Sequence, residues 1–471
     1  MRQLGRGRNT CWDGRVPTDT TTEFDRRPLA VGLLSGVFAT AFEGIAVTTS
    51  MPAAATELGR IEWYAWAFSL YMVGMLIGSV SGGRLADGRG PLPAMVIGMT
   101  GFALGLAVAG LATTMEILLL GRLVQGLGAG VLGVALYVVI ASAFTEDQRP
   151  AMMTAFSACW ILPAFVGPPL AAWVTTTWSW HWVFWGILPL VVLAAVLATP
   201  PLIKLQAQRE PTTDATPVPI WVGLVLGAAA VAVQYAGQRF SAQRDWLVLV
   251  SLLAGVGLLA VALPRLMPRG FLTLGRGLPA VMASRALVAG AFFGGEAFIP
   301  LMLVEQRGLS LGVAGAMLTV GASGWFIGSW LQSRRWFRLP RDRMIVLGSA
   351  SVAVGLLGCA VVAYLPGLWV GVAWLVWPFA GFGMGLVIAS TGLAQMTFSR
   401  LSEQGRNASA LTSGESLGNS VITGVAGTIF AALHLATPGP VTFAAVLVSM
   451  VLIAGLGVCN ATRIGEIRAP E

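Results

Sequence analysis

The chain has 471 residues, of which 56% are hydrophobic and only 11% are charged, and its mean hydropathy is +0.77. A soluble fold cannot hide so much apolar surface from water, so the composition excludes soluble enzymes and soluble binding domains. The net charge of +8 does not indicate a nucleic-acid partner, because no hydrophilic segment is long enough to form a basic domain. The composition therefore predicts an all-α integral membrane protein embedded in a lipid bilayer.

The first 27 residues contain six arginines and no apolar core, which predicts a hydrophilic tail and not a cleavable signal peptide. Apolar windows long enough to cross a ~30 Å hydrocarbon core follow along the chain. Fourteen such spans are predicted, at 28–51, 63–83, 92–112, 117–143, 152–174, 182–199, 219–238, 246–263, 279–303, 311–332, 343–364, 368–393, 408–433 and 440–460.

The basic residues divide unevenly between the two sides of the membrane that these spans define. The two tails and the alternate loops on their side hold 23 of the 29 lysines and arginines, and the opposite loops hold four. Loops rich in lysine and arginine stay in the cytoplasm, so both termini are predicted to be cytoplasmic and the protein to lie in the cytoplasmic membrane.

The chain also repeats itself. "AFEGIAVTTSMP" lies in the first span and "FGGEAFIPLML" in the ninth, which places Glu43 and Glu296 at similar depths. Two related six-helix bundles with an inserted helix pair explain this repeat. The predicted division is a cytoplasmic tail (1–27), an N-terminal bundle (28–200), a cytoplasmic linker (201–218), the inserted pair with its cytoplasmic loop (219–278), a C-terminal bundle (279–461) and a second cytoplasmic tail (462–471).

Several kinds of chemistry are not indicated. The only lysine, Lys204, lies outside any Gly-Lys-Ser/Thr sequence, so ATP hydrolysis is not expected. The four cysteines form no CxxC pair, and we expect no metal, no cofactor and no catalytic residues. "GAGVLG" at 128–133 matches a dinucleotide-binding pattern, but it lies within an apolar span, where small residues typically allow close helix packing.

Four stretches stand in a characteristic order on these elements: "FEGIAVTTSMP" in the first span, "GGRLADGRG" in the first hairpin, "GRLVQGLGAG" in the fourth span and "PAFVGPPLAAW" in the fifth. Together they resemble the major facilitator superfamily, and more narrowly its fourteen-span drug:proton antiporter group. The resemblance covers residues 28 to 460. It implies two six-helix bundles that alternate in access to the two sides of the membrane.

The resemblance also implies roles for individual residues. In the hairpin, Gly83, Asp87, Arg89 and Gly90 match the gating motif, although the basic pair that usually follows is replaced by Pro91 and Leu92. The alternative is that Asp87 belongs to an ordinary capped turn. In the fifth span Gly167 and Pro168 match the antiporter motif, whereas Pro163 stands in place of an earlier glycine and the last two glycines are alanines here. Prolines at these positions remove helix hydrogen bonds, which suits a moving helix.

Charged residues inside the membrane are costly and usually functional, so we assign proton coupling to Glu43 and Glu296. For Arg122 the resemblance implies a role in proton transfer. Two alternatives remain open: Arg122 extends to the nearby membrane surface, and Glu43 only hydrogen-bonds to neighbouring helices. Candidate cavity-lining residues within the spans are Gln125, Trp160, Phe292, Phe293, Trp325 and Glu415. The alternative for the aromatic residues is ordinary helix packing, and for Glu415 it is solvation near the cytoplasm. His181 lies in the surface stretch "WSWHWVFW" and is a further candidate for proton relay.

These features predict a proton-coupled exporter of amphipathic, drug-like small molecules that works as a monomer. One alternative is proton-coupled transport of a specific native metabolite or lipid, including uptake. Another is a membrane sensor that transports nothing, although no soluble signalling domain is visible.

Overall fold

The computed structural model describes residues 26–144, 148–207, 219–242, 245–268, 270–271, 273–332, 334, 336–337, 339–399, 404–436 and 439–465. Within these ranges the chain forms fifteen α-helices and one short 3-10 helix, and no strand. The helices are α1 (Arg27–Glu57), α2 (Tyr64–Arg89), α3 (Pro91–Gly110), α4 (Met115–Ala143), α5 (Arg149–Thr177), α6 (His181–Trp185), α7 (Leu188–Ala207), α8 (Ile220–Ala242), α9 (Trp246–Leu266), α10 (Leu278–Glu305), α11 (Leu311–Gln332), α12 (Arg341–Tyr364), α13 (Gly371–Phe398), α14 (Gln404–Ala436) and α15 (Pro440–Ala461).

Thirteen helical segments in the described part are long and apolar enough to cross a membrane, with α6 and α7 counted together as one of them. Helix α5, which has 29 residues, is the fourteenth long helix and coincides with the fifth predicted span. The prediction of an all-α membrane protein with about fourteen spans is therefore confirmed. The break between α6 and α7 at Gly186 and Ile187 was not predicted.

Local sequence explains where several helices begin and end. Gly90 adopts a φ of +95°, which ends α2, and Pro91 then occupies the first turn of α3, where its missing N–H costs nothing. The Thr114 hydroxyl accepts a hydrogen bond from Ile117 N at 3.5 Å and so caps α4. Helix α5 continues through Pro163, Pro168 and Pro169, because neighbouring helices support it where its own hydrogen bonds are missing.

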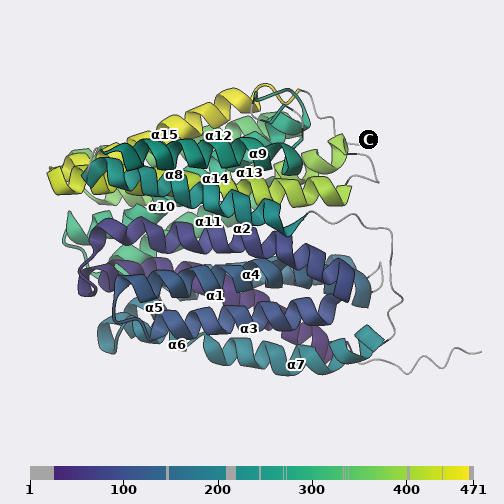
Figure 1. Ribbon diagram of the computed structural model, residues 1–471. Helices are drawn as coiled ribbons and strands as arrows, with labels where there is room; N and C mark the ends of the chain where they lie inside the picture. The colour runs from purple at the N-terminus through teal and green to yellow at the C-terminus, as the bar shows by residue number, and fades with distance from the viewer. Residues whose placement is uncertain are drawn as a thin grey trace, which may run out of the picture.

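The long helices run roughly parallel to one another (Figure 1). In one half of the molecule α1 packs on α5 and α7, and α4 packs on α2 and α3. In the other half α10 packs on α14 and α15, and α13 packs on α11 and α12. The two halves meet along α2 with α14 and along α5 with α11. We call these two sets of helices, α1–α7 and α10–α15, the N-bundle and the C-bundle.

The chain ends give the molecule a direction. Helix α1 begins at the same end where Arg463, just after α15, donates a hydrogen bond to Leu274 O before α10. We call this end, where the described part of the chain begins and ends, the tail end (Figure 1, right). The opposite end, where α1 finishes at Glu57, is the far end. Odd-numbered and even-numbered spans therefore run in opposite directions between these two ends.

The core of the N-bundle is built on glycines of α4. A side chain at Gly126 or Gly130 would overlap the backbone of α2 at Tyr71 or Met75, and one at Gly128 would overlap Phe102 of α3. The "GAGVLG" stretch is therefore a packing surface, as its position inside a span indicates.

This packing predicts a contrast between two glycines of the same helix. We expect Gly128→Ala to lower the free energy of unfolding by about 1–3 kcal/mol, because its Cβ overlaps the Phe102 backbone. Gly133→Ala should be neutral or stabilising by at most about 1 kcal/mol, since a Cβ there meets no described heavy atom within 4 Å. Melting of the detergent-solubilised variants measures both, and equal melting temperatures would refute the packing role.

Candidate functional site

The site centres on a buried ion pair between α1 and α4. Arg122 Nη1 contacts Glu43 Oε1, and the two side chains are 3% and 0% exposed. Helix α1 carries Glu43 at mid-length, and α4 carries Arg122 two turns from its far-end start. The structure thus brings together two of the predicted proton-coupling residues. The alternative in which Arg122 extends to the membrane surface is not the arrangement observed.

Neighbouring groups hold the Arg122 guanidinium in place. Its Nε donates to Ala67 O at 3.0 Å, and Nη1 also donates to Gln125 Oε1 at 2.8 Å. The Tyr71 ring lies 4.3 Å from the guanidinium carbon, in a cation–π arrangement. Gln125, predicted to line a cavity, is instead fully buried beside this pair.

The pair is not fully satisfied. Among the described residues, the second carboxylate oxygen of Glu43, Oε2, has no hydrogen-bond partner, and neither has Gln125 Nε2. A buried polar atom without a partner costs free energy and is often explained by a functional role. Glu43 Oε2 is a position where a proton, or a donor group of a bound molecule, would find an unoccupied acceptor.

Around this pair, the far-end halves of the two bundles are packed together. The Tyr64 hydroxyl of α2 donates to Ala297 O of α10 at 2.6 Å. Near mid-membrane the Ser420 hydroxyl of α14 donates to Ser69 O of α2 at 3.4 Å. On the other side of the interface Thr49 of α1 packs directly on Gly315 of α11. The far end is thus closed by contacts between the bundles.

The tail-end halves of the two bundles differ from the far-end halves in exposure. Tyr137 on α4 and Met396 on α13 are 54% and 55% exposed. Cβ positions at Gly133 and Gly392, on the same halves of these helices, meet no described heavy atom within 4 Å. Tyr137 lies within electrostatic range of Arg285 and Glu415 across the interface. The bundles therefore contact one another at the far end, whereas these tail-end positions are exposed.

A second ion pair lies in the C-bundle. Arg285 of α10 donates through Nε to Glu415 Oε2 of α14 at 2.8 Å, and its Nη2 lies 2.7 Å from the same oxygen. Arg285 Nη1 also donates to Ile388 O of α13 at 3.1 Å, so the arginine joins three helices. Glu415 was predicted, but its partner was missed. Arg285 could have been identified from the sequence, because it is one of only two arginines within the predicted spans.

Glu296, the counterpart of Glu43 in the repeat, has different surroundings. In the part of the chain that the structure describes, no hydrogen bond or ion pair reaches its carboxyl group, which is partly buried in α10. A lone carboxylate within a membrane protein is costly unless a cation lies next to it. Glu43 and Glu296 are therefore alike in depth but not in charge environment.

Aromatic rings gather one turn from Glu296. Phe292 stacks on Trp377 with ring centroids 5.1 Å apart and meets Trp325 edge-on at 5.8 Å. Phe293 completes the group, 6.2 Å from Trp325. Three predicted cavity residues thus lie together, and Trp377 joins them although it was missed. Trp160 lies on a different helix, α5, where its side chain is 49% exposed.

The hairpin motif lies at the tail end of α2. Arg89 is exposed, and its carbonyl accepts a hydrogen bond from Gln206 Nε2 of α7 at 2.7 Å. Gly90 supplies the positive φ of the turn, and Gly83 has open space at its Cβ position among described atoms. The side chain of Asp87 lies outside the described ones, so its gating role stays a prediction.

The fifth-span motif is placed on the inner side of α5. Pro163, Gly167 and Pro168 are buried, and a Cβ on Gly167 would lie 3.3 Å from Ile45 of α1. This contact lies two residues along α1 from Glu43. Helix α5 therefore packs on α1 next to Glu43, one of the residues assigned to proton coupling.

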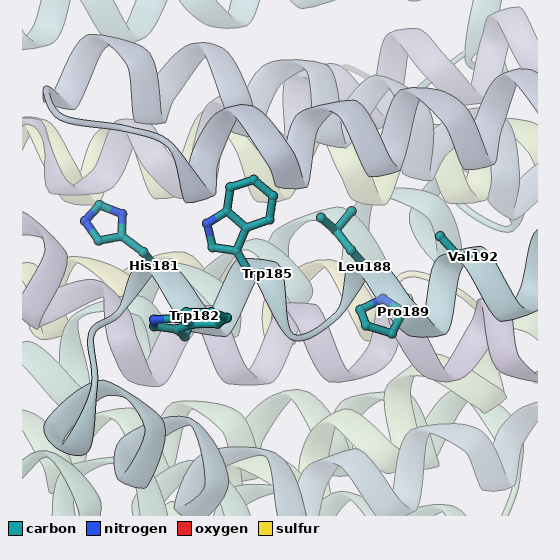
Figure 2. Close-up of a pocket in the computed structure, with 6 residues that line it drawn as sticks. All are labelled: His181, Trp182, Trp185, Leu188, Pro189 and Val192. Carbon is teal, nitrogen blue, oxygen red and sulfur yellow. The ribbon is translucent and has the colours of Figure 1, made fainter.

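A cavity of about 590 Å³ lies elsewhere, at the far end beside α6 and α7. Figure 2 shows its lining, which is His181, Trp182, Trp185, Leu188, Pro189 and Val192. His181 Nε2 lies 3.9 Å from Glu57 Oε1, about four helical turns along α1 from Glu43. His181 is therefore placed at the surface and away from the buried pair. Among the described residues no group of histidine, cysteine and carboxylate side chains resembles a metal site.

Comparison with proteins of known sequence gives the following relatives. Multidrug resistance protein 3 of Bacillus subtilis is 32% identical over 179 residues, which cover 38% of this chain and 35% of that protein. Multidrug transporter protein MdtP of the same organism is 25% identical over 80% of this chain and 70% of its own length. Multidrug efflux pump SdrM of Staphylococcus aureus is 23% identical over 59% and 63%. The match thus spans about a third of the first relative and most of the second.

Several solved structures have a fold similar to that of this chain. A peptide transporter POT in complex with sulfate superposes with a TM-score of 0.67 over 93% of this chain and 94% of that chain, at 15% identity. The sequence profile of the Major Facilitator Superfamily matches residues 33–423, which is most of the chain. The chain belongs to the Major Facilitator Superfamily.

Proposed function

We propose that this protein exports amphipathic, drug-like compounds in exchange for protons, by alternating access between the two bundles. The observation that carries the proposal is the buried Glu43–Arg122 pair with its unpartnered Glu43 Oε2. The names of the relatives, multidrug transporters and efflux pumps, support the class of cargo. The contacts at the far end and the exposed tail-end halves support alternation.

The coupling follows from the charge balance of the pair. When Glu43 is ionised, Arg122 neutralises it; when Glu43 takes up a proton, that attraction is lost and Arg122 keeps only its neutral partners. A cargo molecule that competes for Glu43 or displaces Arg122 changes the same balance. Proton and cargo then exclude one another at one site, which is the requirement for exchange in opposite directions.

We further propose that the tail end faces the cytoplasm and the far end faces outward. The distribution of 23 basic residues on the tail side supports this orientation. With the far end closed, the structure then represents the state in which cargo enters from the cytoplasm. One chain contains both bundles, so a monomer suffices for the transport cycle.

The orientation predicts the outcome of cysteine labelling. A cysteine at residue 338, in the arginine-rich loop between the tenth and eleventh spans, should resist a membrane-impermeant thiol reagent in intact cells and react after the cells are opened. A cysteine replacing Glu57, at the far end of α1, is the matched outward position and should react without lysis. Reaction at 338 from outside intact cells would reverse the proposed direction.

The test of the function is flux in inverted membrane vesicles. Dyes and antibiotics of amphipathic character are supplied outside, and a pH gradient, acidic inside, is imposed. The proposal predicts uptake of at least one compound into vesicles that contain the protein, and collapse of this uptake when the gradient is dissipated. Movement in the opposite direction would favour import, and gradient-driven movement of only one metabolite or lipid would favour a dedicated carrier. No flux of any compound would favour a sensor.

A further inference from the structure

The ion pair of Arg285 and Glu415 in the C-bundle is not used by the proposed coupling site. Tyr137, which lies within electrostatic range of this pair, is fifteen residues beyond Arg122 on α4, or about 22 Å closer to the tail end. The pair therefore belongs to the tail-end half of the molecule, on the side from which the proposed function has cargo enter.

Arg285 directs its hydrogen bonds at only one oxygen of Glu415. Its Nε and Nη2 both reach Glu415 Oε2, at 2.8 and 2.7 Å. Its Nη1 donates to Ile388 O at 3.1 Å and to Thr391 Oγ1 at 3.4 Å, so α13 holds the guanidinium in place. Among the described residues none donates a hydrogen bond to the other carboxylate oxygen, Glu415 Oε1. The pair thus keeps one unused hydrogen-bond acceptor.

This pair is more accessible than the pair at Glu43. The side chains of Arg285 and Glu415 are 11% and 18% exposed, whereas those of Arg122 and Glu43 are 3% and 0% exposed. Glu415 therefore presents polar surface in the observed arrangement of the helices. Glu43 becomes accessible to cargo only when the helices around it move.

An aromatic ring from the N-bundle lies near this carboxylate. Tyr137 of α4 is 54% exposed and lies within electrostatic range of both Arg285 and Glu415. Phe156 of α5 packs against Tyr137, with ring centroids 5.3 Å apart, and so supports its position. A carboxylate oxygen without a donor and an exposed aromatic ring can together bind an organic cation, by hydrogen bonding and by cation–π attraction.

The charge of the pair distinguishes between two kinds of organic cation. Arg285 already neutralises Glu415, so the site offers little net charge to attract a cation that cannot donate a hydrogen bond. A protonated amine carries an N–H and can donate a charge-assisted hydrogen bond to Glu415 Oε1. A quaternary ammonium has no N–H, so it keeps only the contact with the ring of Tyr137.

We propose that Glu415 and Tyr137 form an entry site for cargo that selects protonated amines over quaternary ammonium compounds. Arg285 is the positioning residue, because it fixes one oxygen of Glu415 and leaves the other for the amine. The inference rests on the proposed function for the direction in which cargo moves. Binding at the entry site itself requires neither a pH gradient nor a proton on Glu43.

A matched pair of compounds tests the entry site. Chlorpromazine is an aromatic tertiary amine that is protonated at neutral pH, and its N-methyl quaternary analogue has a methyl group in place of the N–H. Binding of each compound to the purified full-length protein is measured by equilibrium dialysis at pH 7, without a gradient. The wild type is expected to bind chlorpromazine roughly tenfold more tightly than the analogue, as a hydrogen bond to a charged group predicts.

Three variants locate the origin of this preference. Glu415→Gln should bind the two compounds about equally, because an amide whose oxygen faces Arg285 presents only N–H groups to the amine. Tyr137→Leu should weaken the binding of both compounds and keep the preference; since it leaves the ion pair intact, it gives a result even where Glu415→Gln does not fold. Glu57→Gln, exposed at the far end of α1, is the matched control and should bind like the wild type.

Several results would overturn the entry site: equal affinities or no binding of either compound in the wild type, a preference that survives Glu415→Gln, or unchanged affinities in Tyr137→Leu. Because no gradient is applied, this test is separate from the flux test of the proposed function. Loss of the preference in Glu415→Gln, together with no gradient-driven flux of any compound, would support the entry site and refute proton-driven export. Flux without any preference for the amine would refute the entry site alone.

Discussion

Replacing Glu43 with glutamine is expected to reduce pH-gradient-driven efflux to the level of empty vesicles while leaving the protein folded. Glutamine has the shape of a protonated glutamate but cannot release a proton, so the exchange at this position stops. Arg122 keeps its hydrogen bonds to Ala67 O and Gln125, which supports folding of the variant. Efflux into inverted vesicles with an imposed pH gradient measures the loss.

The same helix offers a control. Glu57 ends α1 at the surface, where its side chain is 60% exposed, so Glu57→Gln should transport like the wild type. Glu296→Gln should have a weaker effect than Glu43→Gln, since no cation among the described residues is paired with Glu296. Undiminished gradient-driven efflux by Glu43→Gln would remove the Glu43–Arg122 pair from the coupling mechanism.

Arg122→Gln is expected to be strongly destabilising, by about 3–5 kcal/mol, because it leaves the buried Glu43 carboxylate without its counter-charge. The double variant Glu43→Gln with Arg122→Gln removes both charges and should recover most of that stability. It should still fail in gradient-driven efflux, since neither member of the pair remains. Apparent melting temperatures of the four proteins, measured in one detergent, give the coupling between the two positions.

This set distinguishes a functional pair from ordinary packing. If the losses of stability in the two single variants simply add in the double variant, the two charges do not interact. The contact then contributes nothing to the free energy of unfolding. If the double variant regains stability and also transports in response to a pH gradient, the pair is structural and another group carries the proton.

The membrane spans were predictable from the sequence because hydropathy along the chain reports the length of each apolar segment. The first window, 28–51, lies within α1, and the windows at 219–238 and 246–263 coincide with α8 and α9. Hydropathy does not report which way a helix face points. Trp160 was therefore chosen for its depth but is exposed, whereas Trp377, at the centre of the aromatic group, was missed.

Which charged residues pair with one another could be read only from the fold. Glu43 and Arg122 are 79 residues apart and both attract notice as charges within apolar spans. Arg285 is also a charge within an apolar span. Its pairing with Glu415 depends on α10 and α14 being neighbours, which the sequence around either residue does not reveal. The position of α8 across both bundles was likewise invisible, because its glycines fit a lipid-facing helix and a packed one equally well.

Proton release on cargo binding tests the competition between proton and cargo at Glu43 most directly. An amphipathic compound that the vesicle assay identifies as cargo is added to purified protein in weakly buffered detergent solution, and the pH change is followed together with binding of the compound. The wild type is expected to release protons as cargo binds, and Glu43→Gln is expected to bind cargo without releasing them. Equal proton release from Glu43→Gln and the wild type would contradict the claim that cargo and proton compete at Glu43.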